Sequence, residues 1–191
     1  MTSDLKEKQG LPPWLINLEE MLEDNLTYKE IKPWYEYREI IESRLAKKKE
    51  LQIEDFKHAL AEQRLGRCLE SLEEHIEDKW NATESIRLVQ ALHHKKVPRD
   101  HHLWYSKIEA CQEALAKAKA NPFNFYSLSA ASGIRAAMYS IDYTAESALC
   151  AAKCYALTGW SEISVKAREK VAWIAEREML VQVLKSGLNI K

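Results

Sequence analysis

The sequence is poor in the residues that interrupt helices and in those that crosslink small secreted domains. It contains five glycines, five prolines and four cysteines in 191 residues. So little glycine and proline is typical of long helices with little strand, and it leaves few positions for a loop that cradles phosphates. Four scattered cysteines are too few for a disulfide scaffold, so we expect reduced thiols.

Long hydrophobic runs are also missing. No stretch approaches the ~18 uninterrupted apolar residues of a membrane span, and the first ten residues carry charges where a secretory signal needs an apolar run. We therefore expect a soluble, cytoplasmic protein without a membrane partner. The common enzyme fingerprints are absent as well, from the nucleophile elbow to the EF-hand loop. We accordingly expect no cofactor, and we favour a function other than catalysis.

Helical periodicity is the main positive signal. Ala61, Leu65, Cys68 and Leu72 recur at spacings of three and four, which places them on one face of a helix. The chain predicts an all-α bundle of about seven or eight helices in a single compact domain. We expect residues 1–50 to form a helical appendage packed on a bundle core of residues 51–191, with the last helix central.

Several short patterns predict where individual helices begin and end. Thr27 and Glu30 have the spacing of a capping box, and Pro33 is expected to kink or restart the helix that follows. Asn81 and Asp100 are predicted to cap two later helices, and the last helix is expected to reach Lys185 before Ser186 and Gly187 close it.

Charge is divided unevenly along the chain. Residues 1–80 carry 13 Lys and Arg against 19 Asp and Glu, whereas residues 81–191 carry 15 against 10. This division favours a charged partner, and the acidic half argues against nucleic acid as that partner. Aromatic side chains flanked by charges, and an acidic run that mimics phosphates, are both suited to protein interfaces. The candidate partner-binding residues are Trp34, Tyr35, Glu36, Tyr37, Glu39, Glu70, Glu73, Glu74 and Glu77.

Each of these features has a structural alternative. Trp34 and Ile41 can attach their helix to the bundle, and the acidic run can be a solvated helix face. Cys150 and Cys154 share one helical face, and among alanines they are expected to be buried apolar residues.

Four of the six histidines lie within ten residues, in the segment HHKKVPRDHH. One interpretation is a metal site that uses His93, His94, His101 and His102. A metal ion needs three or four ligands, however, and adjacent histidines on a helix point about 100° apart. The favoured interpretation is structural, because cationic side chains in the last turn of a helix complement its dipole.

A catalytic interpretation depends on Arg87 and His93. An arginine followed by a histidine at this spacing is similar to the signature of the HEPN ribonucleases, which are all-helical. This resemblance implies a metal-independent ribonuclease in which Arg87 stabilises phosphate charge and His93 transfers a proton.

The segment between residues 97 and 120, together with the alanine-rich helices after it, resembles a family of bacterial immunity proteins. The matching elements are Pro98-Arg99-Asp100, Ile108-Glu109-Ala110, Glu113-Ala114, the run from Ala130 to Ala156, and Arg177-Glu178. The resemblance covers about residues 55–184. It implies a cytoplasmic antagonist that binds and occludes a toxin or effector. We therefore expect a non-enzymatic binding protein with a protein partner, and the sequence leaves self-association open.

Overall fold

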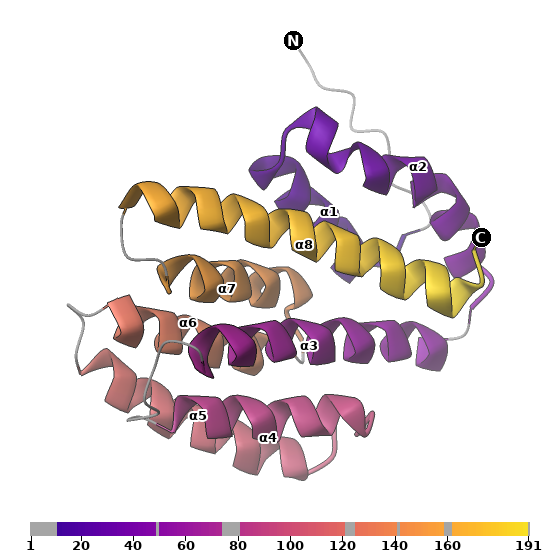
Figure 1. The fold of residues 1–191 in the computed structure, drawn as a ribbon. Helices are drawn as coiled ribbons and strands as arrows, with labels where there is room; N and C mark the ends of the chain where they lie inside the picture. The colour runs from indigo at the N-terminus through magenta and orange to yellow at the C-terminus, as the bar shows by residue number, and fades with distance from the viewer. Residues whose placement is uncertain are drawn as a thin grey trace.

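The computed structural model describes residues 11–48, 50–73, 81–120, 125–140, 142–158 and 162–190, and every regular element in these ranges is an α-helix. This confirms the predicted all-α bundle. The helices are α1 (Pro13–Asn25), α2 (Tyr28–Leu45), α3 (Glu50–Glu73), α4 (Ala82–His94), α5 (Leu103–Lys119), α6 (Phe125–Tyr139), α7 (Thr144–Leu157) and α8 (Glu162–Leu188). Figure 1 shows α1 and α2 at one end of the molecule, α4 and α5 at the other, and the remaining helices between them. No helix in the described part of the chain combines the length and apolar character that a bilayer span requires.

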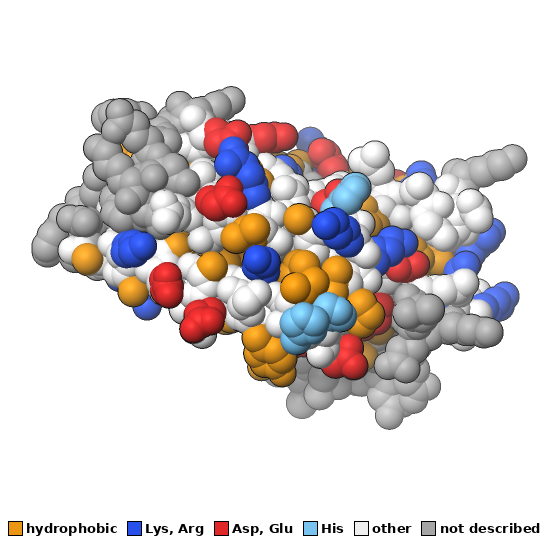
Figure 2. Space-filling view, turned by 90° about the horizontal axis from the view of Figure 1, so that it is seen from below, with side chains coloured by type: hydrophobic (Ala, Val, Ile, Leu, Met, Phe, Trp, Pro, Cys, Tyr) orange, Lys and Arg blue, Asp and Glu red, His pale blue; other side chains and the backbone are white. Residues whose placement is uncertain are grey.

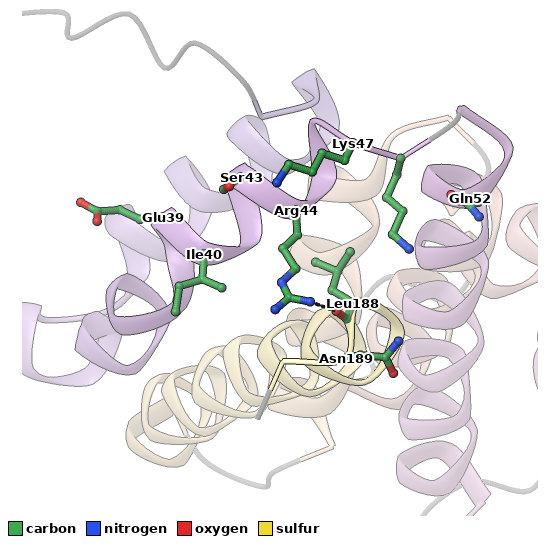
Figure 3. A pocket seen from close by; sticks show the side chains of 9 residues that line it. Glu39, Ile40, Ser43, Arg44, Lys47, Gln52, Leu188 and Asn189 are labelled. Atoms are coloured by element: carbon green, nitrogen blue, oxygen red, sulfur yellow. Dashed lines mark hydrogen bonds between the residues drawn. The ribbon is translucent and has the colours of Figure 1, made fainter.

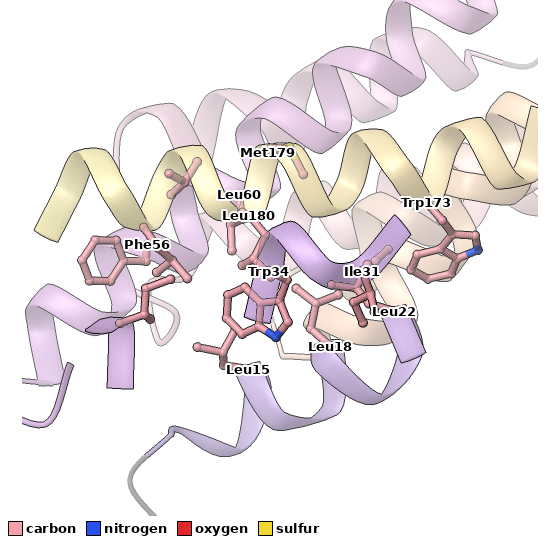
Figure 4. Close-up of a cluster of buried hydrophobic side chains, with 14 of the residues drawn as sticks. Leu15, Leu18, Leu22, Ile31, Trp34, Phe56, Leu60, Trp173, Met179 and Leu180 are labelled. Atoms are coloured by element: carbon pink, nitrogen blue, oxygen red, sulfur yellow. The ribbon is translucent and has the colours of Figure 1, made fainter. Parts of the chain in front are cut away.

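The bundle contains two hydrophobic cores. The first core, drawn in part in Figure 4, lies between α1, α2, α7, α8 and the first half of α3, and large side chains dominate it. Its fully buried members include Leu15, Leu18, Leu22, Trp34, Ile41, Leu60, Trp173 and Leu180. Helices α1 and α2 thus pack on the rest of the bundle, and they supply about a third of the buried members of this core.

The second core lies between α4, α5, α6 and the second half of α3, and small side chains dominate it. Its buried members include Cys68, Ala82, Cys111, Ala114, Ala130, Ala136, Ala137 and Cys154. Small side chains let helix axes approach closely. Gly133 lies at one tightly packed point, since an added Cβ there would lie 3.1 Å from both Cys154 Sγ and Ile86 Cδ1.

Polar contacts join α2 to the central helix α8. The Arg177 guanidinium donates a hydrogen bond to the Glu30 carbonyl oxygen. Arg44 donates to the carbonyl oxygen of Leu188 over 3.1 Å, and the ammonium of Lys185 lies 3.9 Å from the centre of the Tyr37 ring. Since α8 also packs on α1, α3 and α7, it is central as expected.

The predicted helix boundaries are partly confirmed. The capping box is present, because the Glu30 carboxylate accepts the Thr27 N–H over 2.9 Å. Helix α2 continues through Pro33 instead of restarting. The last helix runs to Leu188, beyond the predicted end at Lys185 and through the predicted stop at Gly187, and Asn189 takes the left-handed conformation with φ 54°.

Of the two predicted caps, Asn81 has the predicted position but no capping side chain, and Asp100 is wrong. Asn81 precedes α4, but its backbone is left-handed (φ 56°) and its side chain makes no capping hydrogen bond. Asp100 does not cap α5, which begins only at Leu103. In its place, Nδ1 of His101 accepts the backbone N–H of Leu103 over 3.3 Å, a local bond of the kind that Asn and Asp side chains make in turns.

Candidate functional site

The first histidine pair ends α4 as predicted, but its two members lie in different environments. His94 is exposed, and its Nδ1 lies 2.8 Å from the Glu62 carboxylate. His93 points inward and is only 3% exposed. Its ring meets the edge of the Trp104 indole, with the ring centres 5.0 Å apart.

His93 lies in a buried chain of hydrogen bonds that joins α3, α4 and α6. Its Nδ1 is 3.0 Å from Nδ1 of His58, and its Nε2 is 2.8 Å from the hydroxyl oxygen of Ser140. That hydroxyl donates in turn to the carbonyl oxygen of Ala137 over 2.6 Å. We call this chain of four groups, from His58 to the Ala137 carbonyl, the histidine relay.

The directions of these hydrogen bonds determine which ring nitrogen of each histidine carries a proton. A carbonyl oxygen only accepts hydrogen bonds, so the single Ser140 hydroxyl proton lies between Ser140 and Ala137. Nε2 of His93 must therefore carry a proton. Burial lowers the pKa of His93 to about 3, so its ring is neutral and its Nδ1 has no proton. Nδ1 of His58 then donates, and Nε2 of a neutral His58 is left as an acceptor.

His58 forms part of the wall of a surface cleft of about 530 Å³. The cleft is lined by Glu54, Asp55, His58, Lys96, Pro98, Arg99 and Asp100. Burial lowers the pKa of His58, whereas the carboxylates of Glu54 and Asp55 act in the opposite direction. The imidazole therefore stays neutral near pH 7 while lying among charged groups.

Both cations of the cleft are already paired. The Lys96 ammonium lies 3.1 Å from an Asp55 carboxylate oxygen. Nε of Arg99 lies 3.1 Å from the Glu54 carboxylate, and its Nη1 lies 3.0 Å from that of Asp142. Within the described part of the chain, Asp100 makes no ion pair, so it is the one lining carboxylate whose charge is uncompensated.

The structure gives no support to the metal interpretation of the histidine pairs. His101 accepts the Leu103 N–H, and its ring stacks on His102 with centres 4.4 Å apart. His93 and His94 have the separate partners described above. Among the residues that the structure describes, no three His, Cys, Asp or Glu side chains are grouped so that they could hold a metal ion.

Arg87 and His93 do not form one catalytic surface. Arg87 is exposed and pairs with the Glu73 carboxylate, whereas His93 is buried. A histidine whose pKa is about 3 is neutral near pH 7, so it is not the imidazolium acid that would protonate a leaving group. This arrangement does not match the chemistry that the HEPN resemblance implies.

The structure removes Trp34 from the candidate partner surface. Its side chain is fully buried in the first core among Leu15, Leu18 and Leu22, as Figure 4 shows. The structural alternative, that Trp34 and Ile41 attach α2 to the bundle, is therefore the correct one. A tryptophan at this spacing also completes the apolar stripe of α2, so burial is its ordinary state.

The other candidate partner residues have mixed positions. Tyr35 and Tyr37 are half-buried, and the Tyr35 hydroxyl donates to Glu23 over 2.8 Å. The exposed acidic residues are Glu36, Glu39, Glu70 and Glu73. Glu36 pairs with Lys32 and Glu73 with Arg87, so this surface is less acidic than the sequence implies. Glu74 and Glu77 lie outside the described residues.

A different surface exposes large apolar side chains. Tyr105 is 75% exposed, Tyr143 is 57% exposed, and Leu103 and Tyr139 are each 38% exposed. The Arg99–Asp142 ion pair holds the loop before α5 against the turn after α6, and the rings of Tyr139 and Tyr143 meet at 6.2 Å. Figure 2 shows hydrophobic side chains gathered around histidine side chains on one face. We call the exposed side chains at this end of α5, α6 and α7 the tyrosine patch, which comprises His102, Leu103, Tyr105, Tyr139 and Tyr143.

The thiols have structural positions. Of the two cysteines predicted to be buried among alanines, Cys154 is buried, whereas Cys150 is only partly buried because it lies nearer the surface of α7. Cys68 and Cys111 are also buried. A hydrogen bond with Cys154, together with burial, raises the pKa of the Cys68 thiol well above its usual value. Burial raises the pKa of Cys111 to about 12. Both are therefore protonated thiols, which are poor nucleophiles.

Another groove, of about 720 Å³, lies where α2 ends, α3 begins and α8 ends, and Figure 3 shows its lining. Arg44 crosses this groove to reach the Leu188 carbonyl oxygen. Because the Arg44 guanidinium already donates to a carbonyl oxygen at the end of α8, the groove has fewer free hydrogen-bond donors than its lining residues suggest.

His58 is a residue of the candidate site that the sequence patterns above do not predict. It lies three residues before Ala61, on the same apolar stripe as Leu65 and Cys68, so its burial could have been inferred from periodicity. Ser140 carries no comparable local signal. Comparison with known proteins finds no matching family model, no matching curated protein and no matching solved structure.

Proposed function

We propose that this protein is a non-enzymatic binding protein and that its protein partner contacts the tyrosine patch. The observation that carries the proposal is the exposure of Leu103, Tyr105, Tyr139 and Tyr143 on the ends of packed helices. Tyrosine provides a large contact area at a low cost in side-chain entropy, and aromatic residues are enriched at interfaces. The ion pair between Arg99 and Asp142 supports the proposal, because it fixes the patch before a partner arrives.

The resemblance to immunity proteins makes the proposal more specific. In this form, the partner is a toxin or effector, and the protein acts by occluding it. The contact surface differs from the one that the sequence favoured, because Trp34 is buried and several surface carboxylates are paired. The binding energy then comes mainly from apolar contact and less from phosphate mimicry.

The test compares two sets of tyrosine variants in an affinity capture from the source cells. Tyr105→Ser with Tyr143→Ser removes two exposed rings of the patch, and Tyr28→Ser removes an equally exposed ring on α2. We expect the wild type and Tyr28→Ser to retain the same partner, and the double variant to lose it. Truncating one interface anchor costs about 2 kcal/mol or more, which is roughly thirtyfold in affinity.

Two further measurements decide the nature of the partner. If the partner is a toxin, the wild-type protein restores growth to cells that express it, and the double variant does not. If the partner is a second copy of this chain, light scattering gives a dimer for the wild type and a monomer for the double variant. An intrinsic hydrolase activity that one point substitution abolishes would contradict a purely binding role.

A further inference from the structure

The cleft beside His58 has the features of a ligand site that is separate from the tyrosine patch. Its volume of about 530 Å³ lies within the usual range for small-ligand sites. His58 is only 8% exposed, yet it forms part of the lining. No hydrogen bond from the described part of the chain reaches its Nε2. A buried imidazole with a free nitrogen at a cleft is suited to contact a bound group.

The relay determines which kind of group can be bound. The Ser140 hydroxyl donates its proton to the Ala137 carbonyl oxygen, Nε2 of His93 donates to Ser140, and Nδ1 of His58 donates to Nδ1 of His93. Nε2 of neutral His58 is therefore an acceptor, and a ligand must bring the hydrogen. The three hydrogen bonds of the relay run in the same direction, so they polarise the His58 ring and make its Nε2 a stronger acceptor.

The charges around the cleft select the sign of the ligand. Lys96 and Arg99 are neutralised by Asp55 and Glu54, so an anion would have to break an existing ion pair. The carboxylate of Asp100 has no such partner in the described residues. A metal ion is disfavoured, because no group of three suitable ligands occurs there. The remaining class is an organic cation with N–H donors.

We propose that this cleft binds a primary ammonium group, which donates one hydrogen bond to Nε2 of His58 and pairs with the carboxylate of Asp100. The ammonium belongs either to a small free amine or to a lysine side chain of another protein. Both sources present the same three N–H donors. The proposal does not depend on the tyrosine patch, because it uses neither its residues nor its partner.

The experiment is a titration followed by the ¹⁵N shift of His58 Nε2 in long-range ¹H–¹⁵N spectra. The probes are 1,5-diaminopentane for a free amine and Nα-acetyl-lysine methylamide for a protein side chain, and tetramethylammonium is a cation without N–H donors. We expect at least one of the primary ammonium probes to move the His58 signal, and tetramethylammonium to leave it unchanged. A response to 1,5-diaminopentane alone assigns the site to free amines, and a response to the lysine probe alone assigns it to a protein side chain. A response to both shows that the ammonium group itself is recognised.

Matched variants test the second contact. Asp100→Asn removes the uncompensated carboxylate, and Glu109→Gln removes an equally exposed carboxylate on α5. Because a charged hydrogen bond contributes about 1.5–3 kcal/mol, Asp100→Asn is expected to weaken binding by roughly tenfold or more, while Glu109→Gln has no effect. Both positions are exposed, so folding is preserved and circular dichroism can check it. The proposal is overturned if neither ammonium probe moves the His58 signal, if tetramethylammonium moves it equally, or if the two variants bind alike.

Discussion

The two cores of this bundle achieve burial in different ways. The first core fills its volume with leucine and tryptophan side chains, and the buried polar groups beside it are long ionic side chains, as in the Arg64–Glu176 and Arg38–Glu19 ion pairs. The second core brings helices close together through alanine, serine and cysteine. Close helix backbones leave buried polar groups within reach of one another, so Ser129 donates to the Cys154 carbonyl oxygen over 2.7 Å and Ser147 to that of Ala136 over 2.8 Å. The histidine relay belongs to this second region.

The comparison teaches where a polar site can form in a helical bundle. Beside the first core, a buried polar group reaches its partner through a long ionic side chain, as Arg64 reaches the Glu176 carboxylate. A buried imidazole is shorter, and without a partner it would cost several kcal/mol. The small-residue core supplies a hydroxyl and a carbonyl at the correct place, Ser140 and Ala137. The two regions should therefore respond differently to changes in volume and in pH.

The largest effect is expected from removing volume in the first core. Trp34→Ala leaves a cavity among packed leucines, and we expect it to lower the free energy of unfolding by about 3–5 kcal/mol. Tyr28→Ala, at a ring 75% exposed on the same helix, is expected to change it by less than about 0.5 kcal/mol. Chemical denaturation measures both values. Equal losses for the two variants would show that Trp34 is not part of the core.

The next effect is a pH dependence that arises in the second core. Burial holds the pKa of His93 at about 3, below its ordinary value of 6.5, so the unfolded chain takes up a proton that the folded chain does not. Stability is therefore retained above pH 6.5 and falls as the pH drops from 6.5 towards 3, by up to about 1.4 kcal/mol per pH unit for a histidine of this kind.

The matched variants His93→Gln and His102→Gln isolate this contribution. His93→Gln removes the buried titrating group, so we expect a flatter decline in the denaturation midpoint between pH 6.5 and 4.5. His102 is exposed, and its variant should follow the wild type. The charges that face the histidine pair, Glu54, Asp55, Lys96 and Arg64, are the same in every sample. Parallel pH profiles for the wild type and His93→Gln would contradict the burial of a neutral His93.

The smallest effects are expected from adding a single methyl group at glycine. Gly133→Ala places a Cβ 3.1 Å from Cys154 Sγ and Ile86 Cδ1 in the tightly packed second core, and we expect a loss of about 1–3 kcal/mol. At Gly66, only the flexible Gln90 amide lies as close, so Gly66→Ala should be neutral or stabilise helix α3 by up to about 1 kcal/mol. Thermal unfolding of the two variants measures the difference, and a stabilising Gly133→Ala would refute tight packing there.

The sequence predicts the local features of this protein better than the distant ones. Periodicity and the Thr27–Glu30 capping box depend on neighbouring residues, and both predictions are confirmed. Aspartate is a common helix cap, so the sequence favours Asp100 as the cap of α5. In the structure, the backbone N–H of Leu103 donates instead to Nδ1 of His101. A preference among residue types cannot resolve which of two adjacent polar side chains points at a helix end.

The candidate site shows the same limit more strongly. His93 was singled out from its neighbours in sequence, but its environment depends on His58 and on Ser140, which is 47 residues away along the chain. No local pattern announces that pairing, because it arises from the packing of α3, α4 and α6. Likewise, the burial of Trp34 and the exposure of Tyr105 follow from which helix faces meet. Such facts require the tertiary arrangement.

The most direct test of the histidine relay is the protonation pattern of its two rings, measured by long-range ¹H–¹⁵N spectroscopy at pH 7. The structure predicts that His93 carries its proton on Nε2 and His58 on Nδ1, so that Nε2 of His58 has the shift of an unprotonated nitrogen. Ser140→Ala removes the hydroxyl that determines the protonation of His93, so both histidines are expected to show a mixture of tautomers. A proton on Nε2 of His58 in the wild-type protein would contradict the relay and the acceptor site that depends on it.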